Sequence, residues 1–174
     1  MFLLEEIKPY IHVRFLGEKV DRNEKRLQDS FNKTAEIYDK ETETFHHKIS
    51  EYITKENLLL ELPKNKDIKI LDSGGGTGKY SIYLNELGYD VTLIDISQNS
   101  LNQAKRKARE KDISFDTLLL NSEETSFPNN SFDFIMMNGG VISYTPNPDK
   151  LLKETFRILK PKGLLFFDFL NSVG

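Results

Sequence analysis

From residue 67 onward, short apolar runs alternate with segments in which apolar residues recur every three or four positions. The apolar runs are typical of strands that are buried on both faces of a sheet. They cover residues 68–71, 90–95, 113–120, 132–137 and 164–170. Such alternation predicts an α/β fold, in which a doubly wound parallel sheet of about five strands carries helices on both faces.

Between these runs, three segments have the periodicity of amphipathic helices. Gly88 is suited to end the first helix, and either Ser97 or Asn99 to cap the second. Asn147 and Pro148 form a suitable start for the third. The apolar stripes are Tyr80, Tyr83, Leu84 and Leu87, then Leu101, Ala104 and Ala108, and finally Leu151, Leu152, Phe156 and Leu159.

The N-terminal part differs, because residues 22–62 have helical periodicity and no strong strand signal. Residues 11–15 alternate apolar and polar side chains, which predicts a short, half-buried strand. We therefore expect one compact unit with two parts. Residues 1–62 form an N-terminal arm and cap helices, and residues 63–174 form the sheet domain.

Composition narrows the function classes. The net charge of −3 gives no bulk attraction to nucleic acid or to an anionic membrane. Without cysteine the chain has no disulfide, thiolate zinc site or cysteine nucleophile, which suits the cytoplasm. No apolar run approaches the ~18 residues of a membrane span. The basic residues of segment 105–111 lie opposite the apolar stripe of their helix, which predicts a solvated face rather than a nucleic-acid interface.

The most informative segment is the glycine-rich stretch between the first expected strand and the first expected helix. Gly74, Gly76 and Gly78 alternate with other residues there. Glycine lets a ligand approach bare backbone, and the start of a helix offers unpaired N–H groups. A nucleotide-like ligand is expected. A phosphate-binding P-loop is excluded, because Ser73 and Tyr80 occupy positions that this motif requires to be Gly and Ser or Thr.

Two acids refine this expectation. Asp72 ends the first strand, and Asp95 ends the second, about 20 residues further on, where a ribose-binding acid is expected. The dinucleotide fingerprint fits Gly74 and Gly76 but meets Lys79 at its third glycine. A nicotinamide-dependent oxidoreductase therefore stays open as a disfavoured alternative.

Several motifs, in this order, resemble the class I S-adenosylmethionine-dependent methyltransferases, in particular the small-molecule, quinone-biosynthesis-like type. Segment 31–39 resembles the family's N-terminal cap helix, and Asp72 with its glycines resembles the first motif. Later matches are Asp95, the run Asn121-Ser122-Glu123, the lead Phe127-Pro128 to Asp133, and the turn of residues 157–163.

The resemblance implies a Rossmann-like domain that binds S-adenosylmethionine, transfers its methyl group to a small-molecule acceptor and leaves S-adenosylhomocysteine. It implies no metal. The cofactor-binding residues expected from it are Tyr38, Asp72, Gly74, Gly75, Gly76, Asp95, Ile96, Asn121, Ser122, Glu123 and Asn138. Because the methyl group is already activated, alignment and exclusion of water are the main tasks, and no catalytic residue is assigned. Tyr144 is the best candidate to face the acceptor.

The sequence also departs from this family. Asn121 replaces the usual acid, and Asn138-Gly139-Gly140 replaces the common pattern after the fourth strand. The sequence ends after the fifth expected strand and lacks the usual C-terminal strand hairpin, so the fifth strand would be an exposed edge. The strand of residues 11–15 or a second copy of the chain, in a homodimer, could cover that edge. A cofactor-binding module without catalysis remains a further alternative.

Overall fold

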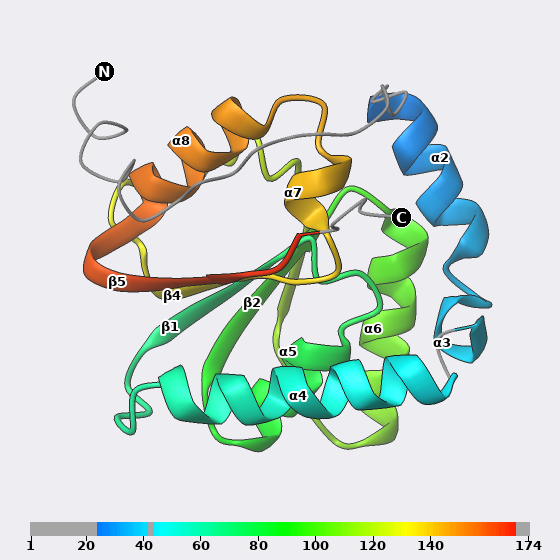
Figure 1. Cartoon of the computed structure of the whole chain (residues 1–174), viewed down its shortest axis with the longest axis horizontal. Helices are drawn as coiled ribbons and strands as arrows, with labels where there is room; N and C mark the ends of the chain where they lie inside the picture. Colours follow the sequence, from blue (N-terminus) through cyan, green and yellow to red (C-terminus); the bar gives the residue numbers. More distant parts are fainter. Residues whose placement is uncertain (1–23, 42–43, 170–174) are drawn as a thin grey trace.

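A parallel sheet with the strand order β3-β2-β1-β4-β5 forms the centre of the molecule. The computed structural model describes residues 24–41 and 44–169 (Figure 1). The predicted doubly wound sheet is confirmed, and the strand that leads into the glycines lies in its middle. The strands are β1 (Lys69–Ser73), β2 (Asp90–Asp95), β3 (Asp116–Leu119), β4 (Phe132–Met137) and β5 (Leu159–Phe167).

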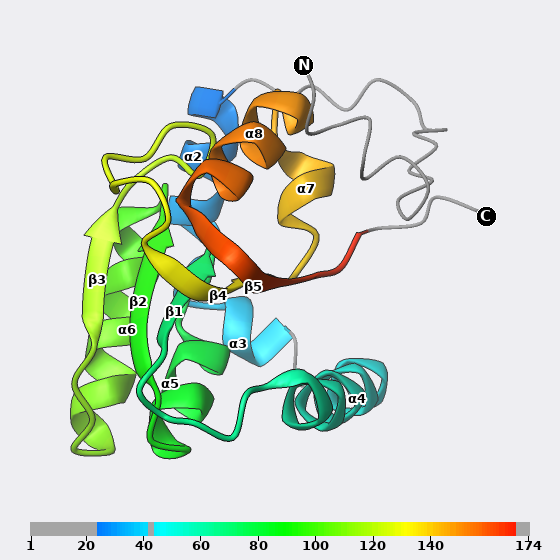
Figure 2. The same ribbon diagram turned by 90° about the vertical axis from the view of Figure 1, so that its left-hand side faces the viewer.

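Successive side chains of the strands point to opposite faces of the sheet, and each face has its own core. Ile70 and Phe134 pack against α4 (Phe45–Glu61) and α5 (Lys79–Glu86). On the same face, Leu93 packs against α6 (Gln98–Glu110). Leu71 and Ile135 pack on the other face, against α7 (Val141–Tyr144) and α8 (Pro148–Ile158) (Figure 2).

Local signals fixed the ends of the predicted helices. After α5, Gly88 has a φ of 87°, and Tyr89 N–H reaches the Leu84 carbonyl at 3.2 Å, which is the pattern of a glycine C-cap. Ser97, rather than Asn99, caps α6, since its hydroxyl accepts from Ser100 N–H at 3.1 Å. Asn147 caps α8 as predicted.

The predicted start of the fifth strand is wrong. β5 begins at Leu159, directly after α8, and pairs with Phe132 of β4. The next paired residues are Phe134 and Leu164, so a bulge of β5 occupies residues 160–163, which we expected to form a turn before the strand. Lys160 anchors this bulge, because its ammonium lies 2.7 Å from Asp133 Oδ2.

β3 is also shorter and more exposed than predicted. The prediction covered residues 113–120 as a strand buried on both faces, but pairing is confined to Asp116–Leu119. Leu118 and Leu119 are 41% and 48% exposed. β3 lies at the edge of the sheet, and the segment from β3 to β4 contains no helix that would cover it.

The N-terminal region forms α2 (Glu24–Thr34), α3 (Tyr38–Glu41) and α4, separated by short breaks. α2 lies at the carboxyl end of the sheet, beside the start of α6 (Figures 1 and 2). The strand expected at residues 11–15 lies outside the described residues. Among the described residues, no helix has both the length and the apolar character that a bilayer span requires.

Candidate functional site

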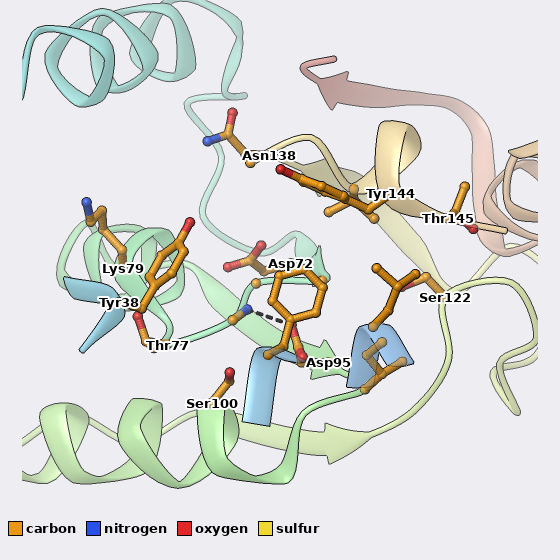
Figure 3. A pocket seen from close by; sticks show the side chains of 18 of the residues that line it. Tyr38, Asp72, Thr77, Lys79, Asp95, Ser100, Ser122, Asn138, Tyr144 and Thr145 are labelled. Carbon is orange, nitrogen blue, oxygen red and sulfur yellow. Dashed lines mark hydrogen bonds between the residues drawn. The ribbon is translucent and has the colours of Figure 1, made fainter. Parts of the chain in front are cut away.

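A cavity of about 530 Å³ opens at the carboxyl ends of β1, β2 and β4, where open α/β sheets bind their ligands (Figure 3). α2 and α3 cover it, and the N-terminal half of α4 closes one side. All of the cofactor-binding residues predicted from the sequence border this cavity: Tyr38, Asp72, Gly74, Gly75, Gly76, Asp95, Ile96, Asn121, Ser122, Glu123 and Asn138. These residues are far apart in the sequence, and the fold brings them together around one cavity.

The glycines of the turn serve different purposes. A Cβ on Gly78 would lie 2.8 Å from the Ala104 Cβ, so this glycine permits close packing of the turn on α6. A Cβ on Gly74 would lie 2.7 Å from Val141, and one on Gly75 2.5 Å from the Asp72 carboxyl group. Gly76 has a φ of 55° and open space where its Cβ would be. Of these four, Gly76 is the glycine that leaves free room beside the backbone.

Asp95 connects the end of β2 to this turn. Its Oδ2 accepts from Gly76 N–H at 2.9 Å, and its Oδ1 accepts from Ser97 N–H at 2.8 Å. The side chain is almost buried, and burial raises its pKa although these N–H groups oppose the shift. Each carboxylate oxygen has a second lone pair, so Asp95 keeps acceptor capacity for two ligand hydroxyls in the cavity.

Asp72 lies deeper, at the end of β1. Its Oδ2 accepts from the Ser81 hydroxyl of α5 at 2.6 Å, and the residue is only 1% exposed. Burial, opposed by the Ser81 bonds and reinforced by the charge of Asp95, raises the pKa of Asp72 to about 6. Asp72 therefore fixes the glycine turn relative to α5, and it adds a titratable negative charge to the cavity wall.

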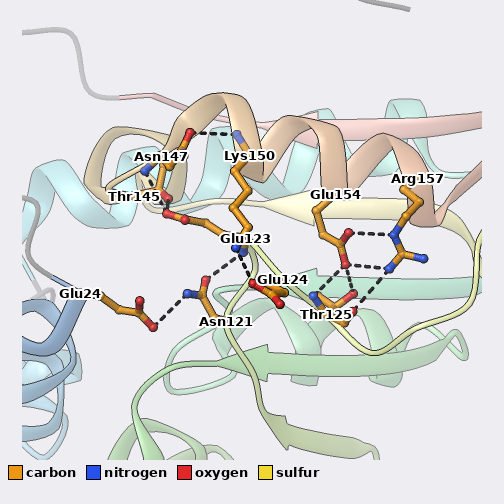
Figure 4. A network of polar contacts seen from close by, with 10 residues as sticks. All are labelled: Glu24, Asn121, Glu123, Glu124, Thr125, Thr145, Asn147, Lys150, Glu154 and Arg157. Atoms are coloured by element: carbon orange, nitrogen blue, oxygen red, sulfur yellow. Dashed lines mark hydrogen bonds and ion pairs between the residues drawn. The ribbon is translucent and has the colours of Figure 1, made fainter. Parts of the chain in front are cut away.

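The segment after β3 forms another wall, and its side chains bind other parts of the protein (Figure 4). Asn121 donates to Glu24 of α2 at 2.9 Å and accepts from Glu123 N–H at 2.8 Å. The buried Glu123 carboxylate accepts from the Thr145 hydroxyl and from Asn147 N–H. This wall therefore joins α2 to the segment between α7 and α8, and it presents mainly backbone to a ligand.

The adjoining wall contains α7, a short helix that the sequence did not reveal. Gly139 and Gly140 both have positive φ, and their N–H groups donate to the two carboxylate oxygens of Asp168 at 3.0 and 2.7 Å. Sequence reasoning missed Asp168 because nothing local distinguishes a polar residue that follows the fifth strand. At the end of α7, Tyr144 borders the cavity and meets Phe31 edge-on at 6.0 Å.

The basic segment of α6 requires a correction. Lys107 does not lie on a solvated face, since its side chain is 21% exposed and its ammonium lies 2.8 Å from Asp39 Oδ2 of α3. It also donates to the Thr77 hydroxyl at 3.0 Å, and that hydroxyl donates to Asp39 Oδ1 at 2.8 Å. α6 turns this lysine toward α3, and a helical periodicity alone could not show that α3 lies there.

Tyr38 precedes Asp39 and approaches the cavity from the side opposite Tyr144 (Figure 3). Burial raises the pKa of its hydroxyl first, and the nearby Tyr144 and the acids Asp39, Asp168 and Asp95 raise it further. The cavity is thus lined by aromatic rings and several carboxylates. Lys79, which also borders it, is paired with Glu51 at 3.2 Å. The site suits a ligand that carries positive charge and hydroxyl groups.

Comparisons with known proteins agree with this geometry. Residues 71–167 match the family described as a methyltransferase domain. A ubiquinone/menaquinone biosynthesis C-methyltransferase (UbiE) of Rickettsia prowazekii is 30% identical over 162 residues, which cover 87% of this chain and 64% of the relative. The chain thus spans somewhat less than two thirds of that relative's length.

Solved structures show the same fold. A protein from Pyrococcus horikoshii is 25% identical, with a TM-score of 0.66 over 76% of this chain and 58% of its own. A SAM-dependent methyltransferase from Methanosarcina mazei is 34% identical, with a TM-score of 0.56 over 59% of this chain and 52% of its own.

Proposed function

We propose, from the premise that this chain belongs to the methyltransferase domain family, that it binds S-adenosylmethionine in the cavity and methylates a small-molecule acceptor. The observation that carries the proposal is the position of Asp95. Its carboxylate is held by Gly76 and Ser97 N–H groups and borders the cavity with unused lone pairs. A carboxylate in this position is suited to bind the two hydroxyls of a ribose.

The residues around the cavity fit the rest of that cofactor. Asp72 and Asp168 supply negative charge near the turn, which favours an ammonium and a sulfonium group. Gly76 leaves space beside its backbone. In this proposal Ile96 and the backbone of residues 121–123 hold the adenine, and Asn138, Gly74, Gly75 and Tyr38 surround the amino-acid part.

When bound, the cofactor supplies an activated methyl group, so the protein's contribution is alignment and exclusion of water. Leu27 and Phe31 of α2 line the side of the cavity that this helix covers, and their apolar side chains limit the access of water. Tyr38 and Tyr144 face the opening beside Asn138 (Figure 3). These aromatic rings are suited to stack on a flat acceptor, and the carboxylates of the cavity favour an acceptor with little negative charge. The Rickettsia relative is named for C-methylation in quinone biosynthesis, which supports an acceptor of this class.

Calorimetric titration with S-adenosylhomocysteine and, separately, with NAD tests the proposal. We expect binding of S-adenosylhomocysteine with micromolar affinity and no heat from NAD. Binding of NAD alone would favour the oxidoreductase alternative and overturn the proposal. A chain that binds S-adenosylhomocysteine but methylates no acceptor from a panel of quinols, phenols and amines would fit the alternative of a binding module without catalysis.

We further propose that residues 1–62 form an N-terminal arm and cap helices on the cofactor-binding part, residues 63–174, and that the protein works in the cytoplasm as a homodimer. The exposed edge of β5 supports the dimer, because β5 pairs only with β4 among the described strands and Leu164 is 41% exposed. Sedimentation equilibrium tests it: a clean monomer at high concentration would exclude the dimer.

A further inference from the structure

Asp39, Thr77 and Lys107 form a closed set of hydrogen bonds between the cap and the glycine turn. We call these three residues the Asp39 cluster. Thr77 lies between Gly76 and Gly78 and is only 3% exposed. Its hydroxyl donates to Asp39 Oδ1, the Lys107 ammonium donates to Asp39 Oδ2 at 2.8 Å, and the same ammonium donates to the Thr77 hydroxyl. Helices α3 and α6 and the glycine turn therefore meet in one place.

The cap depends on such contacts. No residue of α2 is buried, so an apolar core does not hold this helix in place. Apart from the edge-on contact of Phe31 with Tyr144, polar contacts hold it: Gln28 donates to the Ile96 carbonyl at 2.8 Å, and Asn32 Oδ1 accepts from the Ser97 hydroxyl at 2.9 Å. Elements with few buried apolar contacts open at a low free-energy cost. The apolar side chains Leu27 and Phe31 of α2 line the cavity instead.

Among these polar contacts, those of the Asp39 cluster reach the turn itself. Asp39 directly follows Tyr38, and Thr77 directly follows Gly76, whose N–H is bound to Asp95. The ion pair of Asp39 and Lys107 is partly shielded from solvent, with side chains 37% and 21% exposed. The Lys107 and Thr77 hydrogen bonds hold the pKa of Asp39 below its usual value although burial opposes this shift. The contact is therefore made by a charged pair.

We propose that Asp39, Thr77 and Lys107 are positioning residues that hold the cap closed over the bound cofactor and so slow its release. This inference rests on the proposed function. The cluster fixes Tyr38 above the cavity and holds the glycine turn in the form in which Gly76 reaches Asp95. Asp39 and Lys107 are not among the residues that line the cavity, so substituting either one frees the cap without removing a lining group, and the release rate should change more than the fold. Thr77 does line the cavity, but its hydroxyl is bound to Asp39 and Lys107.

Release of S-adenosylhomocysteine, measured by stopped-flow displacement or surface plasmon resonance, tests the proposal. We expect Thr77→Val and Lys107→Met to release the ligand about tenfold faster than the wild type. Thr77→Ser keeps the hydroxyl and should stay within twofold of the wild type. Lys111→Met is the matched control, since Lys111 lies at the C-cap of α6, pairs with Glu86 of α5 at 2.7 Å and is not among the residues that line the cavity. It should also stay within twofold.

A double variant tests whether the residues act together. Asp39→Asn and Lys107→Met remove the same ion pair, so their combination should release the ligand no more than about twofold faster than either single variant. Independent, multiplicative effects would overturn the proposed coupling. Wild-type release from both Thr77→Val and Lys107→Met would overturn the positioning role.

Amide hydrogen exchange of the ligand-free protein separates this inference from the proposed function. Residues 24–41 should exchange faster in Thr77→Val and Lys107→Met than in Lys111→Met. If the wild type bound no S-adenosylhomocysteine, the proposed function would fail, while exchange would still show whether the cluster holds the cap. Faster exchange with unchanged ligand release would leave a purely structural contact and overturn the positioning role. Unchanged exchange would show that the Asp39 cluster does not hold the cap, and it would overturn the inference.

Discussion

The Asp95 carboxylate accepts a hydrogen bond from the Gly76 N–H at 2.9 Å and so joins the end of β2 to the glycine turn after β1. Asp95 ends β2 and Gly76 lies in the turn after the neighbouring parallel strand β1, and both residues border the cavity (Figure 3). The acid thus orders the turn and keeps further lone pairs for a ligand. Its removal should affect binding more than folding.

We predict that Asp95→Ala weakens the binding of S-adenosylhomocysteine by about 1–3 kcal/mol, the range for lost hydrogen bonds to a charged group. Isothermal titration calorimetry measures this loss. Asp90→Ala is the control, because Asp90 is exposed and lies at the other end of the same strand. Unchanged affinity in a folded Asp95→Ala variant would remove Asp95 from the site.

The raised pKa of Asp72 predicts a pH dependence. The folded protein keeps the Asp72 proton up to about pH 6, whereas the unfolded chain loses it near the ordinary value of 3.8. The free energy of unfolding should therefore fall as the pH rises from about 4 to 6, by ~3 kcal/mol from this group alone. In Asp72→Asn this decrease in the free energy of unfolding should be absent. Urea unfolding of both proteins between pH 4 and 7 gives the difference, and parallel curves would contradict the assignment.

Ligand affinity should change over the same pH range in the opposite sense. Ionised Asp72 attracts an ammonium group, so S-adenosylhomocysteine, whose amino-acid part carries an ammonium beside a carboxylate, should bind more tightly above pH 6 than at pH 5. We expect about a fivefold to tenfold difference in the wild type, because the ionised fraction of a group with a pKa of about 6 rises about tenfold from pH 5 to pH 7. In Asp72→Asn the affinity should vary much less. Calorimetric titrations at pH 5, 6 and 7 check this, and an equal pH dependence in both proteins would exclude Asp72 as its source.

Two glycines with similar backbone angles should differ in their tolerance of a side chain. Gly78 and Gly88 have φ values of 76° and 87°, so alanine is strained at either position. That strain costs about 1–2 kcal/mol. At Gly78 the added Cβ also meets the Ala104 Cβ at 2.8 Å, whereas the space at Gly88 is open.

We therefore predict that Gly78→Ala lowers the free energy of unfolding by ~1–3 kcal/mol more than Gly88→Ala, the range for overpacking. Urea denaturation measures both losses. Ala104→Gly should recover part of the additional loss when it is combined with Gly78→Ala. Equal losses in the two single variants would show that the turn moves freely away from α6.

Glu154 of α8 binds the loop between β3 and β4 (Figure 4). Its Oε1 accepts from the Thr125 N–H at 2.7 Å and from the Thr125 hydroxyl, and its carboxylate pairs with Arg157. The Arg157 bonds, followed by those of Thr125, lower the pKa of Glu154 to about 2 although burial opposes the shift. The stabilisation is therefore present above the ordinary pKa of 4.5 and is lost as the pH falls toward about 2.

Glu154→Gln should cost about 2 kcal/mol of unfolding free energy at pH 7, and the loss should shrink below pH 4.5. Glu124→Gln is the matched control, because Glu124 pairs with Lys150 of the same helix but is 77% exposed. Its unfolding midpoint should match the wild type, since exposed ion pairs add little stability. Chemical denaturation at pH 7 and pH 3 distinguishes the two variants.

The elements that the sequence predicted most accurately are those set by local chemistry. β2 and β4 have the predicted bounds, since each segment is largely apolar and forms an interior strand of the sheet over its whole length. Gly88 was recognised as a helix end, and Ser97 was one of two candidate caps, because caps act within a few residues of themselves. The glycine turn and Asp95 were found in the same way, from the rule that ligands meet the carboxyl ends of parallel strands.

By itself, the sequence determined the class of fold and the order of the strands, and it predicted eleven residues that border the cavity. The tertiary structure decided the rest. Lys107 is separated from Asp39 by 68 residues and Asp168 from Gly140 by 28, so no local pattern links them. Their contacts depend on which segments meet over the carboxyl edge of the sheet. Side chains from distant segments become partners only when the packing of both faces has fixed where each segment lies.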